Sequence, residues 1–243
     1  MSLLITVLIV FVVLVIIYYI IDWATAKSTK LSHISHARKK RISSKKLKGS
    51  NSSNFTFSVW FNVDDWSVNY GKVKKLLQVQ CQKIIPLEIQ LGAESNDIKI
   101  KTKSFGSAAA PPPGGGGLAA STQSHTCHVQ NFPLQKWVNL IVSAYGRTLD
   151  VYIDGKLVKT CVLPGAVAMH NISQIILTEG TDGKPCFKGM TADLTYWSTA
   201  SNPQQAYNIY AAGFGGMGSN FFSKYKLKVS FLEDGKTEGS FEI

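Results

Sequence analysis

Two histidines and a cysteine stand within four residues of one another, at His125, Cys127 and His128. Imidazole and thiolate groups are ligands that zinc prefers, and Cys161 or Cys186 could complete the set. Successive side chains of a strand point to opposite faces, so His125 and Cys127 would share one face and His128 the other. The three side chains could not easily reach one metal ion. We therefore expect these residues to have a structural role and not to be metal ligands.

The chain begins with a long apolar segment. Residues 3–21 form a run of 19 in which Thr6 is the only polar side chain. At about 1.5 Å per residue this run is roughly 28 Å long, close to the hydrocarbon thickness of a bilayer. We predict a transmembrane anchor over residues 1–23. A cleaved signal peptide is the alternative, with an A-x-A-like stretch at 24–26, but the apolar run is too long and no basic residue precedes it.

Most of the positive charge follows this run. Residues 27–48 hold nine basic residues and no acidic one, whereas the chain from Gly49 onward has 17 basic and 14 acidic residues. We interpret residues 24–54 as a basic juxtamembrane linker that contacts lipid headgroups, each basic residue contributing up to ~1 kcal/mol. The expected contact residues are Arg38, Lys39, Lys40, Arg41, Lys45, Lys46 and Lys48. Charges that merely set the topology are an equally good interpretation, and contact with nucleic acid is a weaker one.

The same charges predict the orientation of the chain. By the positive-inside rule the N-terminus is lumenal and the C-terminal domain of this single-pass protein is cytosolic. Sequons at Asn51, Asn54 and Asn171 should then carry no glycan of the endoplasmic-reticulum type. The cysteines fit the same picture as reduced thiols, although an even number permits two disulfides elsewhere. They are Cys81, Cys127, Cys161 and Cys186.

From residue 55 the sequence has the period of β-strands. All odd positions from Phe55 to Val63 are apolar, and further alternating or apolar runs occur at 87–91, 98–103, 137–145, 174–177 and 190–197. Asp154-Gly155 between two such runs favours a two-residue hairpin turn. Asn202 and Pro203 open a short helix that Gly213 ends. About ten short strands and one small helix predict an all-β protein, an antiparallel β-sandwich over residues 55–213.

Two segments depart from this pattern. Residues 104–124 contain three prolines followed by four glycines, which predicts a flexible loop between strands. Residues 214–243 form a C-terminal extension that ends in a predicted hairpin. One face of its first strand could add to the sheet edge of a partner. The residues of that face are Tyr225, Leu227, Val229 and Phe231.

The order of these features resembles a known superfamily. The strand Phe55–Val63, the segment Gln135–Leu140, the Asp-Gly hairpin, the segment Phe187–Trp197 and the closing helix recur in that order. Together they resemble the concanavalin A-like lectin/glucanase superfamily, specifically the laminin-G-like jelly rolls. Residues 137–165 are similar to versions found in minor virion components of large DNA viruses with an internal membrane.

The resemblance also implies two kinds of site, a pair of catalytic carboxylates and a calcium site. Glucanases of this superfamily use carboxylates in a Glu-x-Asp-x-x-Glu pattern, which this sequence lacks; Glu88 stands alone in its strand. We therefore expect no catalytic residues. Many laminin-G-like domains bind calcium through rim carboxylates, and Asp64, Asp65 and Asp182 are the candidates, although acidic residues are common in turns. No cofactor is otherwise expected.

These observations lead to a membrane-anchored structural protein without enzymatic activity. The first hypothesis is a minor capsid component whose sandwich faces the capsid and ties an internal membrane to other virion proteins. The alternative is a membrane-anchored lectin, in which Trp66, Trp137 and Trp197 stack on a glycan, although such tryptophans are more often core residues. An enzyme with a hidden site and an adhesion protein with a lumenal domain are weaker hypotheses.

Overall fold

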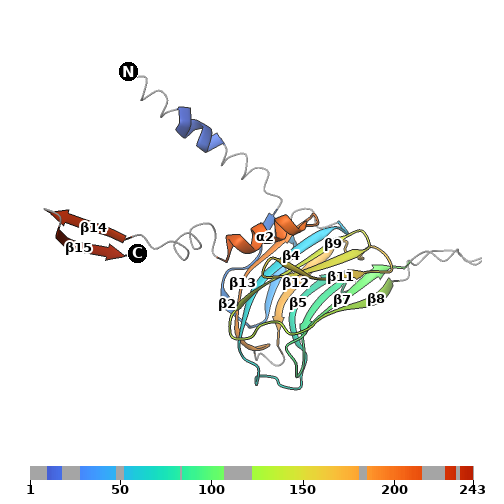
Figure 1. The fold of residues 1–243 in the computed structure, drawn as a ribbon. Helices are drawn as coiled ribbons and strands as arrows, with labels where there is room; N and C mark the ends of the chain where they lie inside the picture. The colour runs from blue at the N-terminus through green and yellow to red at the C-terminus, as the bar shows by residue number, and fades with distance from the viewer. Residues whose placement is uncertain are drawn as a thin grey trace, which may run out of the picture.

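The computed structural model describes residues 10–17, 28–47, 52–82, 84–106, 122–180, 185–214, 228–233 and 236–242. Two antiparallel sheets pack face to face in a jelly-roll-like sandwich (Figure 1). The predicted all-β sandwich is therefore confirmed. Its jelly-roll character was implied by the resemblance and is confirmed as well.

The first sheet, sheet A, has the strand order β1-β13-β4-β9-β10-β11, and β2 also pairs with β13. Its strands are β1 (Ser28–Lys30), β2 (Ser35–His36), β4 (Phe55–Asp65), β9 (Trp137–Tyr145), β10 (Thr148–Ile153), β11 (Lys156–Val162) and β13 (Lys188–Trp197). At the hairpin between β10 and β11, Asp154 and Gly155 both have positive φ, 50° and 73°. The hairpin expected from the Asp-Gly pair is thus confirmed.

The second sheet, sheet B, has the order β3-β12-β5-β6-β7-β8. Its strands are β3 (Lys40–Ser43), β5 (Lys74–Cys81), β6 (Leu87–Leu91), β7 (Ile98–Phe105), β8 (Thr122–Val129) and β12 (Ile172–Glu179). The ends of β7 and β8 extend into the segment expected as a loop, and residues 107–121 lie outside the described residues. A separate pair, β14 (Lys228–Glu233) and β15 (Lys236–Glu242), forms the hairpin expected in the C-terminal extension.

The core lies between the two sheets. Strand β4 faces it with Phe55, Phe57 and Phe61, all at most 1% exposed, against residues such as Val79 and Ile89 of sheet B. Thr56, Ser58 and Trp60 of β4 are buried as well, on the outer face of sheet A, which helix α2 (Pro203–Ala212) covers. Beneath this helix Ala206 packs on Ile141 and Tyr152 in a second small cluster.

Helix α2 begins and ends as its sequence predicts. The Asn202 side chain accepts a hydrogen bond from the backbone N–H of Gln205, and the Gln205 side chain accepts one from the N–H of Asn202, which completes a capping box. Gly213 ends the helix with φ 67°, and its N–H donates to the carbonyl of Tyr210.

The N-terminal part of the sandwich differs from the expected linker. Residues 28–43 contribute three short strands, and a 3-10 turn at Ser44–Lys46 follows them. Leu31, Ala37 and Ile42 are buried in the core. The sandwich therefore begins near residue 28 rather than 55, and only a few positions separate it from the apolar run.

The apolar run itself is described only in part. Residues 10–17 are helical and exposed. Among the described residues no helix has both the length and the apolar character needed to cross a bilayer. The rest of the expected anchor lies outside the described residues.

Candidate functional site

A basic cleft of about 900 Å³ opens at one end of the sandwich, and we call it the hairpin cleft. Its walls come from the β10–β11 hairpin, the segment that joins β8 to β9, and helix α2. The side chains that give it its character are four basic and two aromatic ones. They are His128, Lys136, Lys156, Lys159, Tyr207 and Tyr210.

Charge in the hairpin cleft is predominantly positive. Its only carboxylate among the described lining residues is Asp154, which accepts a hydrogen bond from the N–H of Asn139 at 2.9 Å and lies 3.5 Å from the Lys136 ammonium. Lys156 and Lys159 form no ion pair within the described part of the chain. Both ammonium groups therefore remain available to a negatively charged ligand.

The hairpin and helix walls of the cleft are in direct contact. A Cβ placed on Gly155 would come within 3.0 Å of the Tyr210 Cβ and 3.2 Å of the Tyr207 Cα. Glycine at the second turn position thus serves two purposes, since it adopts positive φ and lets the turn approach the helix. This contact holds Lys156 next to the two tyrosines.

The third wall is a loop fixed by an aromatic anchor. The Phe132 side chain is 1% exposed, and its ring lies 5.4 Å from that of Phe61 and 5.8 Å from that of Trp66. The backbone of Phe132 also pairs with Asn96, through an N–H donated to the Asn96 carbonyl at 2.9 Å and a carbonyl that accepts from Asn96 Nδ2 at 2.7 Å. The wall is therefore positioned by the core.

His128 at the rim of the cleft has an acidic neighbour. Its Nε2 lies 3.6 Å from Oδ2 of Asp97. The pKa of Asp97 is lowered chiefly by the hydrogen bond from the Ser95 hydroxyl, and the backbone N–H of Asn131 and the nearby His128 add to this effect. Asp97 is therefore ionised at neutral pH, and it contacts both His128 and the backbone of Asn131 at the rim of the cleft.

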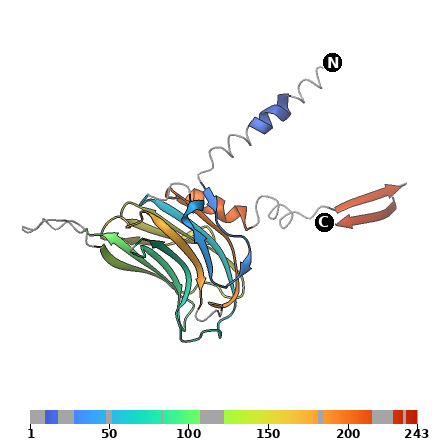
Figure 2. The same cartoon turned by 180° about the vertical axis from the view of Figure 1, so that it is seen from behind.

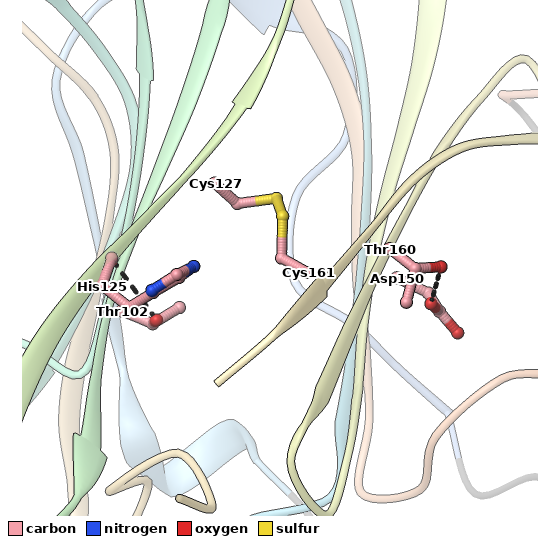
Figure 3. Close-up of a disulfide and its surroundings, with 6 residues drawn as sticks. All are labelled: Thr102, His125, Cys127, Asp150, Thr160 and Cys161. Atoms are coloured by element: carbon pink, nitrogen blue, oxygen red, sulfur yellow. Dashed lines mark hydrogen bonds between the residues drawn. A yellow bond between two sulfur atoms is a disulfide. The ribbon is translucent and has the colours of Figure 1, made fainter. Parts of the chain in front are cut away.

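The oxidation state of the cysteines differs from the expected four reduced thiols, because two of the four form a disulfide. Cys127 of β8 and Cys161 of β11 form a disulfide that joins the free edges of the two sheets (Figure 3). The two cysteines are paired because the sandwich brings the edge strands together, with their Cα atoms 6.1 Å apart. Cys81 and Cys186 are free and buried.

The disulfide also determines what the His-Thr-Cys-His segment can do. Cys127 is oxidised and holds no thiolate for a metal, His125 is half-buried, and His128 lies at the rim of the hairpin cleft. No cluster of three or more potential metal ligands occurs in the described part of the chain.

Of the rim carboxylates considered for calcium, Asp64 is exposed and Asp65 has protein partners. Asp65 Oδ1 accepts the N–H of Ser67 at 2.9 Å, and its Oδ2 lies 3.9 Å from the Lys188 ammonium. The pKa of Asp65 is lowered, first by that backbone hydrogen bond. Asp182 lies outside the described residues.

The tryptophans considered for sugar stacking lie elsewhere. Trp66 receives the ammonium of Lys74 at 4.3 Å from its ring centroid. Trp137 stands 4.3 Å from the ring of Phe214, and Trp197 lines a groove of about 400 Å³ between β1, β13 and α2. None of the three lines the hairpin cleft, whose aromatic side chains are the tyrosines of α2.

Lys74 is a buried cation beneath the ring of Trp66. It is 1% exposed, and its ammonium donates to the carbonyls of Asn69, Lys72 and Ala93 at 3.2–3.5 Å. Burial lowers its pKa. These carbonyls and the Trp66 ring replace water around the charge. Lys74 therefore stabilises the conformation of the 66–74 loop, and its ammonium group is not available to bind a ligand.

Glu88 belongs to a polar ladder on the outer face of sheet B. It accepts hydrogen bonds from the amides of Gln78, at 2.9 Å, and Gln90. Gln80 donates in turn to Gln78 at 2.9 Å. Both carboxylate oxygens of Glu88 are thus hydrogen-bonded to side-chain amides.

The basic residues expected to contact lipid lie on a folded edge rather than on a linker. Arg38, Lys40, Arg41 and Lys45 are exposed along and beside edge strand β3, while Lys39 forms an ion pair with Glu179 at 2.6 Å. The side chains of Lys46 and Lys48 lie outside the described part. Lysine and arginine on an edge strand also discourage pairing with other chains.

Comparisons with known proteins agree with this architecture. A family model described as "Concanavalin A-like lectin/glucanases superfamily" matches residues 38–206. No curated protein matches the sequence.

Solved structures with a similar fold include the binding domains of several toxins. The binding domain of Paraclostridial Mosquitocidal Protein 1 has a TM-score of 0.51 at 13% identity, over 74% of this chain and 42% of that one. The botulinum neurotoxin serotype G binding domain has 0.52 at 12%, over 75% and 45%. The serotype D ligand binding domain, in complex with N-acetylneuraminic acid, has 0.52 at 12%, over 76% and 42%. The chain thus spans less than half of each, and the likeness shows the fold alone.

Proposed function

Because this chain belongs to the concanavalin A-like lectin/glucanase superfamily, we propose that it is a membrane-anchored, non-enzymatic binding protein whose hairpin cleft takes an acidic sugar. One observation carries this proposal: two lysines without ion pairs in the described residues stand beside two tyrosines in a cleft of about 900 Å³. Ammonium groups attract carboxylate or sulfate, and aromatic rings offer apolar faces to sugar rings. The serotype D domain in complex with N-acetylneuraminic acid supports the sugar class by analogy.

The lysines of the hairpin cleft provide the first test. Lys156→Glu combined with Lys159→Glu should weaken binding to a sialylated glycan at least about tenfold at low salt, since tenfold corresponds to about 1.4 kcal/mol. Binding should also weaken in the unaltered protein as salt rises, because exposed charges are screened. Titration of the full chain with a sialylated and a neutral glycan measures both effects.

Lysines of β7 provide the matched control. Lys101→Glu with Lys103→Glu changes the net charge equally, but these side chains line no part of the hairpin cleft. This variant should retain most of the affinity. Equal losses in both variants would show that only net charge matters, and no binding to acidic or neutral sugars would remove the lectin function.

Anchoring in a membrane is supported by the 19-residue apolar run. Val12→Lys combined with Leu14→Lys should release the chain from membranes at alkaline carbonate extraction, because each lysine costs about 2.5–3.5 kcal/mol at the centre of a spanning helix. Thr25→Lys, beyond the run, should leave the protein in the membrane pellet. A double variant that stays in the pellet would contradict the anchor.

A second function, tethering a membrane to a protein shell, is favoured by the C-terminal hairpin. Strands β14 and β15 form a sheet of two strands, and such a sheet is marginally stable alone, so a partner edge would stabilise it. Val229 and Phe231 of the expected contact face fall in β14, whereas Tyr225 and Leu227 lie outside the described residues. Absence of the protein from purified particles, with the chain only in the soluble fraction of the host, would exclude this role.

A further inference from the structure

The disulfide between the sheets bears on the side of the membrane where the sandwich folds. Cys127 is 1% and Cys161 8% exposed, so the bond is enclosed between β8 and β11. Its formation removes two protons and two electrons from the two thiols. A protein disulfide of an oxidising compartment accepts them and becomes a dithiol. Such bonds persist in the lumen and outside the cell, and they are rare in the cytosol.

The remaining cysteines are protected from exchange with this bond. Cys81 and Cys186 are 5% and 1% exposed and lie on other strands and loops of the sandwich. Burial raises the pKa of Cys186 to about 12, so its thiol is protonated and a poor nucleophile. The chain therefore has one disulfide and two inert thiols, a pattern suited to oxidising surroundings.

The basic segment gives weaker evidence for a cytosolic domain once its structure is considered. Lys30 forms an ion pair with Asp193 at 2.8 Å, and Lys39 pairs with Glu179. The exposed members lie along edge strand β3, where positive charge discourages pairing with other chains. Charge bias orients short flanks, whereas folded domains are translocated largely regardless of charge.

One sequon is placed for modification. Asn171 is exposed immediately before β12, and Ser173, two residues later, is exposed as well. At the sequon of Asn54, by contrast, Thr56 is completely buried. Asn51 lies outside the described residues.

Asn171 also lies away from the proposed ligand site. Ile172 pairs with Cys81 at the last residue of β5. The hairpin cleft adjoins Val129, which pairs with Ile98 at the first residue of β7, and that end of the sheet aligns with the start of β5. A sugar chain on Asn171 would thus project from the opposite end of the sandwich.

We propose that the sandwich lies on the lumenal or extracellular side of the membrane and that Asn171 carries an N-linked glycan there. The donor is a lipid-linked oligosaccharide pyrophosphate. Its C1–O bond breaks as the C1–N bond to Asn171 Nδ2 forms, the amide loses a proton, and the lipid pyrophosphate leaves. This orientation is the reverse of the one expected from charge counting, so the two make opposite predictions.

The test uses the full chain produced in eukaryotic cells and recovered in sealed microsomes. We expect an N-glycosidase to increase the gel mobility of the protein, and the sandwich to resist protease added outside the vesicles. Ser173→Ala and Asn171→Gln should each abolish the mobility shift. Ser173→Thr, which keeps the sequon and the hydroxyl that donates to the Gln80 carbonyl, should retain it.

Counting alkylated thiols tests the disulfide in the same samples. Denatured protein should expose two reactive thiols without reductant and four after reduction. A sandwich digested from outside the vesicles, with Asn171 unmodified, would overturn the proposal whatever the state of the cysteines. A glycan that survives Ser173→Ala would overturn the assignment to Asn171.

Discussion

Replacing Cys127 and Cys161 together by serine should lower the free energy of unfolding by roughly 3–4 kcal/mol. The bond closes a loop with a sequence separation of 34, and this is the stabilisation expected when such a loop restricts the unfolded chain. No hydrogen bond ladder joins β8 to β11, so the bond is the covalent link between the two sheet edges. Urea unfolding of the oxidised protein and of the double variant measures the difference.

Reductant supplies the control for this experiment. Dithiothreitol should reduce the stability of the unaltered protein to about that of the double variant and leave the double variant unchanged. Equal stabilities of the two proteins in the absence of reductant would show that the bond contributes nothing. Because domains of this size are stable by about 5–15 kcal/mol, the expected loss is a large share of the total.

Phe132→Ala should cost about 3–5 kcal/mol, the range observed when a buried phenylalanine is truncated. The residue belongs to a loop, yet its ring fills space between Phe61 and Trp66. Loss of the ring should also weaken ligand binding in the hairpin cleft, since the loop forms one wall. Chemical denaturation and glycan titration of the same protein measure the two effects.

Leu134 of the same loop is the matched control. Its side chain is 38% exposed, so Leu134→Ala should cost less than about 1 kcal/mol. A cost for Phe132→Ala as small as this would show that the loop does not depend on its aromatic anchor. Full stability with lost binding would place Phe132 in the ligand site rather than beneath it.

Much of the sandwich could be predicted from the sequence, because its central strands bury one face. The alternation in β4 and the Asp-Gly turn after β10 are local signals, and both features form as expected. Strands β1, β2 and β3 gave no such signal. They have three, two and four residues, and their position comes from pairing with β13 and β12 rather than from a pattern of their own.

The candidate site was less predictable for a physical reason. The hairpin cleft combines three segments that are distant in sequence, and only the closed fold brings Lys156, Lys136 and Tyr207 together. Tyr210 stacks on Trp60, with ring centroids 5.6 Å apart, and also lines the cleft. The disulfide depends in the same way on two edge strands that meet only in the sandwich.

The attachment of the two ends of the sandwich has a mechanical consequence. Strand β1 and the end of α2 lie on the same side of the sandwich (Figures 1 and 2). Residues of both line one groove. Beyond α2, the ring of Phe214 packs on Trp60 and Trp137 of the central strands β4 and β9. Strand β1 lies at a sheet edge and is attached to β13 by three residue pairs and the Lys30–Asp193 ion pair. If the proposed anchor and a ligand in the hairpin cleft were pulled apart, we expect β1 to separate from β13 first. This would lengthen the connection between the membrane and the sandwich while the central strands stayed paired.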